Sequence, residues 1–82
     1  MNLVELTESI IKSLVLDTEA VSVKEFPTDE ENVILIQVMV SDADMGRVIG
    51  RNGRTANAIR TLVQSASYLN NDKKVKINVD SF

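Results

Sequence analysis

The stretch that decides the fold is residues 45–60, which read MGRVIGRNGRTANAIR and contain the Gly-x-x-Gly turn Gly50-Arg51-Asn52-Gly53 between two predicted helices. Glycine has no Cβ atom, so a sugar-phosphate backbone can approach the peptide closely at such a turn. The N–H groups at the start of the following helix, and the positive end of its dipole, favour a phosphate there. Arg51 and Asn52 add hydrogen-bond donors. The stretch therefore predicts a site for the phosphates of a nucleic acid.

Charge is distributed unevenly along the chain. The total, nine Lys and Arg against twelve Asp and Glu, is −3 and argues against nucleic acid. Between Met45 and Asn71, however, there is no Asp or Glu, and this segment holds all four arginines: Arg47, Arg51, Arg54 and Arg60. It carries +4, while the remainder, five Lys minus twelve acids, carries −7. Because charges are screened over about 8 Å at physiological ionic strength, we expect a local basic patch around the turn.

Apolar residues beside the turn indicate where bases would lie. Val48, Ile49 and Ile59 are predicted to form the apolar floor of a groove that accepts unstacked bases. Aromatic residues are rare, and none of the three lies in the motif: Phe26, Tyr68 and Phe82. An aromatic stacking platform like that of RRM domains is therefore not expected, and the groove suits a single strand.

Hydrophobic periodicity predicts six elements. Apolar residues recur every three or four positions in the helices and every second position in the outer strands, whereas the central strand is almost continuously apolar. We expect a short helical turn capped by Asp42 or Asp44 and ended by the Gly-x-x-Gly turn. The other elements are a helix over Leu3 to Leu16, a strand over Ala20 to Phe26, a strand over Val33 to Val40, a helix from Arg54 to about Leu69 that Asn70-Asn71-Asp72 stops, and a strand over Lys74 to Asp80.

This order predicts an α+β fold. A strand hairpin followed by a two-helix crossover into a third, parallel strand gives a three-stranded mixed sheet with the helices on one face. The 82 residues are enough for one core, so we expect a single domain over residues 1–82. No signal peptide is evident at the N-terminus, which predicts a cytoplasmic protein.

The run Val48-Ile49-Gly50-Arg51-Asn52-Gly53 resembles the V-I-G-x-x-G core of KH domains, and the element order α-β-β-α-α-β resembles their type II arrangement. With the continuation Gly53-Arg54-Thr55-Ala56-x-Ala58-Ile59-Arg60, the chain is similar to the small stand-alone bacterial KH proteins of the KhpA (YlqC) family. The resemblance implies cytoplasmic binding of single-stranded RNA with broad sequence tolerance, through a backbone-clamping loop at Gly50 to Gly53. It also implies pairing with itself or with the larger KhpB (Jag/EloR) protein in post-transcriptional and cell-envelope regulation. Ala56 departs from many KH domains, which carry a large aliphatic residue there.

Several residues have two interpretations. Arg60 is either a solvated surface charge or an RNA contact, and Lys73, Lys74 and Lys76 either face solvent or flank the RNA. Apolar residues beyond the needs of a small core belong either to that core or to a subunit interface: Val33, Leu35, Met39, Leu62 and Val63. Nucleotide-binding loops are excluded because Val48 stands where their spacing requires glycine.

Other functions are less compatible with the composition. Without His or Cys, and without a recognisable Ser/Lys or carboxylate constellation, the chain has no evident catalytic residues, metal site or cofactor site. The competing function is a dimerisation module with vestigial nucleic-acid binding, favoured by the acidic total and Ala56. A third class, a DNA-binding regulator, requires affinity for duplex DNA. The sequence does not separate RNA from single-stranded DNA.

Overall fold

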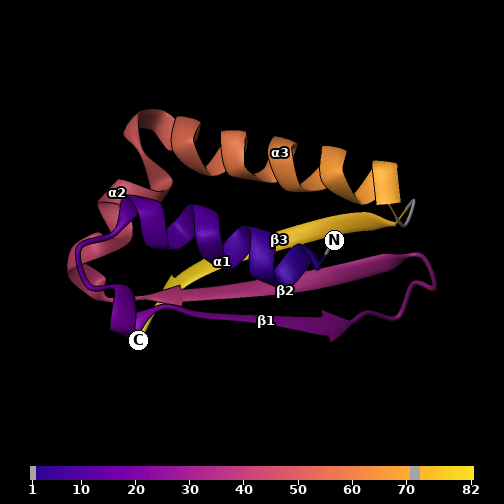
Figure 1. Ribbon diagram of the computed structural model, residues 1–82, viewed down its shortest axis with the longest axis horizontal. Helices are drawn as coiled ribbons and strands as arrows, with labels where there is room; N and C mark the ends of the chain where they lie inside the picture. The colour runs from indigo at the N-terminus through magenta and orange to yellow at the C-terminus, as the bar shows by residue number, and fades with distance from the viewer. Residues whose placement is uncertain (1, 71–72) are drawn as a thin grey trace.

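The computed structural model describes residues 2–70 and 73–82, and its elements follow the predicted order (Figure 1). Between the helices and strands lie three short 3₁₀ turns, η1 (Thr18–Ala20), η2 (Asp42–Asp44) and η3 (Arg51–Gly53). The helices and strands are α1 (Leu3–Leu14), β1 (Ser22–Pro27), β2 (Val33–Val40), α2 (Met45–Ile49), α3 (Arg54–Asn70) and β3 (Lys74–Ser81).

The sheet has the order β1-β2-β3, with β1 antiparallel and β3 parallel to the central strand β2. Its helices all cover one face (Figure 1). The α+β fold, the parallel return of the third strand and the α-β-β-α-α-β arrangement are therefore confirmed. β2 explains the layering, because its alternate residues Ile34, Ile36, Val38 and Val40 are buried beneath the helices. Leu35, Gln37 and Met39 lie half-buried on the opposite, uncovered face.

The core fills the space between the sheet and the helices. Val63 of α3 is completely buried in it, so of the two residues Leu62 and Val63, the latter belongs to the core, while Leu62 is 57% exposed. Ser67 is also buried and donates from its hydroxyl to the carbonyl of Lys73 (2.7 Å). Burial is greatest for these core residues: Ile11, Ile36, Val38, Val40, Val48 and Val63.

Two element boundaries differ from the prediction. α1 ends at Leu14 rather than Leu16, because the N–H groups of Leu16 and Asp17 donate to the Asp44 carboxylate, which draws the chain out of the helix. β1 begins at Ser22, after the 3₁₀ turn η1, and includes Pro27. A proline is tolerated there because β1 is an edge strand and one side of it needs no ladder hydrogen bond.

α3 is described as far as Asn70. The stop predicted for this helix at Asn70-Asn71-Asp72 lies partly outside the described residues, since Asn71 and Asp72 are not among them. None of the helices in residues 2–70 and 73–82 combines the length and apolar character needed to cross a membrane.

Candidate nucleic-acid interface

The Gly-x-x-Gly turn connects α2 to α3 at one end of the molecule (Figure 1). α2 ends where the N–H of Gly50 donates to the carbonyl of Gly46 (2.9 Å), and Gly50 then leaves the helix at φ 76°, ψ 175°. That backbone conformation is essentially restricted to glycine. Gly53 also has a positive φ of 75°, and Asn52 adopts the left-handed helical conformation (φ 57°, ψ 26°). Three of the four turn residues therefore have positive φ.

The two glycines of the turn have different surroundings. A Cβ atom at Gly50 would overlap the side chain of Thr55 in the first turn of α3 and lie 2.9 Å from its backbone nitrogen. A Cβ atom at Gly53 would meet nothing within 4 Å. Gly50 is therefore needed both for its backbone angle and for the close contact with α3, whereas Gly53 is needed for its angle alone.

Charged side chains surround the turn on its solvent side. Arg51, Asn52 and Arg54 are exposed, as is Arg47 one turn before. Arg47 is partly engaged, because its Nε lies 3.4 Å from Oδ1 of Asp44. The guanidinium groups of Arg51 and Arg54 have no ion pair among the described residues and no neighbouring carboxylate in the sequence. The structure thus places the predicted phosphate-binding side chains around one turn, with their donors facing water.

Asp44 anchors the base of α2, and its predicted capping role is wrong. Its carboxylate makes no capping bond to α2. Instead it accepts hydrogen bonds from the N–H groups of Leu16 and Asp17 (both 3.1 Å) and from the Ser41 hydroxyl (2.9 Å), while only 2% exposed. The Leu16 and Asp17 N–H groups, aided by Ser41 and Arg47, lower the pKa of Asp44 below its ordinary value despite its burial. Asp42 is exposed, and η2 also lacks a side-chain cap.

The three predicted floor residues do not share one environment. Val48 and Ile59 are 0% and 3% exposed and belong to the core, so they support the turn and the start of α3 from beneath. Ile49 is half-buried and is the one of the three that presents substantial apolar surface. Ala56 is also buried, at 3% exposure.

A second set of side chains lines the flank of α3 that faces the edge strand β3. Arg60 lies across this gap, where its Nε donates to the carbonyl of Ile77 (3.4 Å) and its Nη1 to Oδ1 of Asn57 (3.0 Å). Gln64 bridges the same two elements, because its Nε2 donates to the carbonyl of Lys73 (3.0 Å) and its Oε1 accepts from the N–H of Val75 (2.9 Å).

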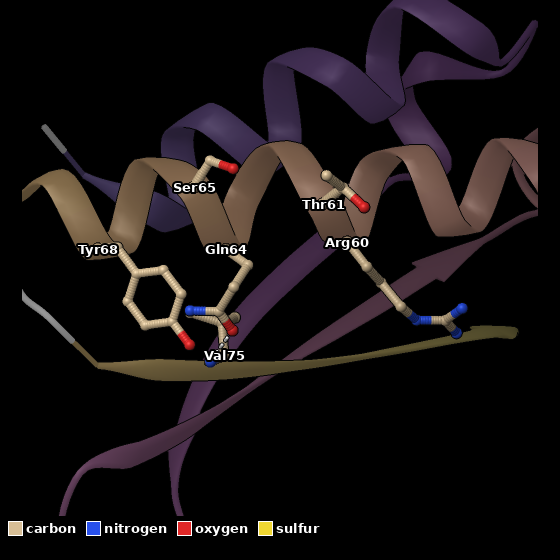
Figure 2. Close-up of a pocket in the computed structure, with 6 residues that line it drawn as sticks. All are labelled: Arg60, Thr61, Gln64, Ser65, Tyr68 and Val75. Atoms are coloured by element: carbon tan, nitrogen blue, oxygen red, sulfur yellow. Dashed lines mark hydrogen bonds between the residues drawn. The ribbon is translucent and has the colours of Figure 1, made fainter.

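These residues border an open cavity of about 340 Å³ between α3 and β3 (Figure 2). Arg60 lies at one end and Tyr68 at the other, with the Tyr68 ring directed from α3 toward β3 beside Gln64 and Val75 (Figure 2). Thr61 and Ser65 complete the lining. We call this cavity and the flank with Asn57 and Arg60 the α3–β3 groove.

The sequence leaves two roles open for Arg60 and does not by itself single out the other side chains of this groove. A signal for them exists in the sequence, because Asn57, Arg60, Gln64 and Tyr68 follow one another at spacings of three, four and four residues. Such spacing places side chains on one face of a helix. Periodicity alone does not tell which neighbour that face meets, and only the packing of α3 beside β3 makes it the wall of a groove.

A family model described as "KhpA/KhpB, KH domain" matches residues 4–79 of the chain. The chain belongs to the KhpA/KhpB KH-domain family. Proteins named RNA-binding protein KhpA are similar over most of their length. The one from Clostridium perfringens is 48% identical over 71 residues, covering 87% of this chain and 92% of the relative. The one from Thermotoga maritima is 35% identical over 75 residues, covering 92% and 95%.

A solved structure shares this fold. A chain in a crystal structure of Era in complex with MgGDPNP and nucleotides 1506-1542 of 16S ribosomal RNA matches with a TM-score of 0.67. The match covers 96% of this chain but 29% of that one, at 17% identity, so the likeness concerns the fold. The predicted family and fold class are therefore both confirmed.

Proposed function

We propose that this KH protein binds single-stranded RNA by clamping its sugar-phosphate backbone at the Gly50 to Gly53 turn. The observation that carries the proposal is the geometry of Gly50, whose positive φ and contact with Thr55 bring the turn against the start of α3. The missing Cβ atom of Gly53 leaves open space in which an RNA backbone can approach closely, and the first N–H groups of a helix favour an anion. Its family relatives named RNA-binding protein KhpA point to the same ligand.

Cationic side chains would add to this contact. Arg47, Arg51 and Arg54 lie around the turn on a chain segment without acids, and Asn52 supplies an amide. Val48 and Ile59 hold the turn in place from the core, while Ile49 offers apolar surface to a base. Since most of these groups would meet phosphates, which every RNA shares, the proposed site has low sequence specificity and spans about four nucleotides.

The test is a double substitution, Arg51→Asp with Asn52→Asp, measured by anisotropy of a labelled single-stranded RNA. Both side chains are exposed, so the fold should survive, as circular dichroism would verify. Losing two charge-assisted contacts and adding repulsion should weaken binding by more than about 100-fold. Lys24→Asp with Asn32→Asp is the matched control, because it changes the net charge equally on β1 and in the β1–β2 loop, away from the turn. Retained affinity in the turn variant would contradict the proposal.

From the family membership we also infer that the chain acts in the cytoplasm as a post-transcriptional regulator or RNA chaperone, including for RNAs connected with cell-envelope growth and division. A backbone clamp with little base readout suits a protein that meets many RNAs. Crosslinking in cells followed by sequencing would test this role. Recovery of RNA from the wild-type protein but not from the turn variant is the expected result.

A second candidate function is protein interaction, in which the chain pairs with a second copy or with a larger KhpB-type protein. The observation that favours it is an apolar stripe on α3, where Leu62 and Leu69 are 57% and 87% exposed. Ala58 continues the stripe at helical spacing, and all three residues are exposed. This stripe lies on a different flank of α3 from Asn57, Arg60, Gln64 and Tyr68, so pairing and RNA binding are compatible.

Leu62→Glu tests the pairing. A charge at the centre of an apolar interface should convert a dimer to a monomer in light scattering, while the exposed position leaves the fold intact. Leu16→Glu is the control, because Leu16 is another exposed leucine (77%) but lies outside α3. A wild-type chain that is monomeric at high concentration and does not bind KhpB would contradict the second candidate.

A further inference from the structure

We propose that Tyr68 forms a stacking subsite for one nucleobase at the far end of the α3–β3 groove, outside the four nucleotides held by the Gly50 to Gly53 turn. This inference rests on the proposed RNA binding and adds a base-contacting site to it. It commits to one occupant, a base of the same RNA strand.

The chemistry at the end of the groove suits a base. Tyr68 is 57% exposed, although its ring is directed toward β3 and borders the cavity with Val75 (Figure 2). An aromatic ring on a single-stranded nucleic-acid path typically stacks with a base, whichever base it is. The cavity of about 340 Å³ gives a ring space beside it. Tyr68 is thus neither fully surrounded by solvent nor part of the core. Its ring lies where a planar ligand fits.

The walls of this cavity are already held in place. Gln64 is hydrogen-bonded at both ends of its amide, to the carbonyl of Lys73 just before β3 and to the N–H of Val75 in β3. Arg60 donates to Ile77 and Asn57, which uses two of its five N–H groups and leaves three directed to solvent or ligand. Binding therefore needs little additional ordering of these side chains, and that lowers its entropic cost.

Continuity with the turn sets the length of RNA required. Tyr68 is fourteen residues beyond Arg54 on the same helix, about 21 Å at 1.5 Å per residue. Arg60 lies between them on the same groove and provides a cation along the path. Four nucleotides centred on the turn extend only two nucleotides toward Tyr68, which is about 7 Å at a stacked spacing of about 3.4 Å and about 14 Å for a fully extended strand. The base at Tyr68 consequently belongs to a nucleotide beyond the clamped four.

The composition of the chain supplies a direct readout. Tyr68 is its only tyrosine and there is no tryptophan, so the intrinsic emission of the native protein reports on this residue. We expect an oligoadenylate of eight nucleotides to quench that emission and one of four nucleotides to bind without quenching. Two further octamers carry four abasic nucleotides, one in its 5′ half and the other in its 3′ half, and both keep all their phosphates. The octamer that lacks the base at Tyr68 should no longer quench the emission.

Binding of labelled RNA by Tyr68 variants gives the second measurement. Tyr68→Ala should reduce octamer affinity by roughly 5- to 100-fold and leave tetramer affinity unchanged, since one stacked base is lost. Tyr68→Trp keeps an aromatic ring at this position and should bind the octamer as tightly as the wild type does. Phe26→Ala, which removes another exposed aromatic residue on β1, is the matched control and should bind both oligonucleotides normally.

The outcomes separate this inference from the proposal on which it rests. The stacking subsite alone is overturned if octamer binding depends on Arg51 and Asn52 but leaves Tyr68 emission unchanged, and if Tyr68→Ala binds the octamer with wild-type affinity. Quenching by the tetramer overturns its location outside the clamp. Failure of every RNA to bind the wild-type protein overturns both.

Discussion

The two ends of α3 are built for different kinds of contact. At its N-terminal end, glycine backbone and freely exposed arginines surround a turn, and the motif of residues 45–60 contains no aromatic residue. Toward its C-terminal end, an aromatic ring, an amide and a guanidinium border a cavity, and the amide and the guanidinium are hydrogen-bonded to β3. The first arrangement suits phosphates, whose positions any RNA provides, and the second suits the flat face of a base.

This difference has a consequence for specificity. A clamp on the backbone positions an RNA without reading it, so selection among RNAs has to come from the groove or from a second subunit. A single helix of this protein would then carry both a sequence-independent contact with the RNA backbone and a weaker contact with bases. The predictions below separate the two ends.

Gly50→Ala should have the largest effect on stability of the proposed variants, and its damage should be confined to the N-terminal end of α3. It places a Cβ atom in a glycine-only backbone region and against Thr55, so we expect a loss of more than about 3 kcal/mol in unfolding free energy, or a displaced turn without RNA affinity. Gly53→Ala should cost about 1–2 kcal/mol, since its Cβ atom meets nothing. Urea unfolding measures both.

Gly46→Ala is the control for these two changes. Gly46 lies within α2, has no positive φ, and a Cβ atom there would meet nothing within 4 Å. Alanine favours a helix over glycine, so this variant should be as stable as the wild type or slightly more stable. Equal stability of all three variants would show that the turn is not held in the described conformation.

The pH dependence of stability tests how Asp44 anchors α2, next to the N-terminal end of α3. Its pKa is lowered in the folded chain by the Leu16 and Asp17 N–H groups, so its contribution to stability is present above its ordinary pKa of 3.8. That contribution is lost as the pH falls below 3.8 and through the lower pKa of the folded state. Asp44→Asn should lower Tm at neutral pH by more than about 5 °C, because the two N–H groups bond to different carboxylate oxygens and the amide replaces one of these with an NH2 donor.

The pH profile of Asp44→Asn gives the contrasting measurement. Below pH 4 the wild type should lose Tm more steeply than the variant, since the variant has no proton to take up at this position. Parallel profiles of the two proteins would refute the anchoring role of Asp44. RNA contacts at the Tyr68 end of α3 should be less affected by this change than contacts at the turn.

Salt dependence should show the smallest effect and sharpen the comparison. Two or three phosphate contacts at the turn predict a slope of log K against log salt of about −1.5 to −2, at roughly −0.7 for each contact with a single strand. Tyr68→Ala should leave this slope unchanged because stacking releases no counterions. Arg60→Gln should reduce it by about 0.7 if Arg60 holds a phosphate and leave it unchanged if Arg60 faces a base. A slope near zero for the wild type would contradict the phosphate clamp.

Local signals were enough for most of the fold. β2 is predicted to the residue because an eight-residue β-branched and apolar run has few alternatives. The Gly50 to Gly53 turn is predicted because glycine is favoured where a chain turns at positive φ. Asp44 shows the limit of this reasoning. Its position before a short helix suggests a cap, yet its partners Leu16 and Asp17 are 28 and 27 residues away in the chain. The same bonds explain why α1 ends two residues early.

The sequence by itself determined the order of elements, the central strand, the turn and the positive segment around it, because each depends on residues close together in the chain. The tertiary structure decided which apolar residues are surface and which are core: Val48 and Ile59 became buried supports, and Leu62 became exposed. It also decided that Arg60 donates a hydrogen bond to Ile77 and that Tyr68 and Val75 line the same cavity. Those contacts arise only when α3 folds back along β3, and no local pattern specifies the partner of a helix face.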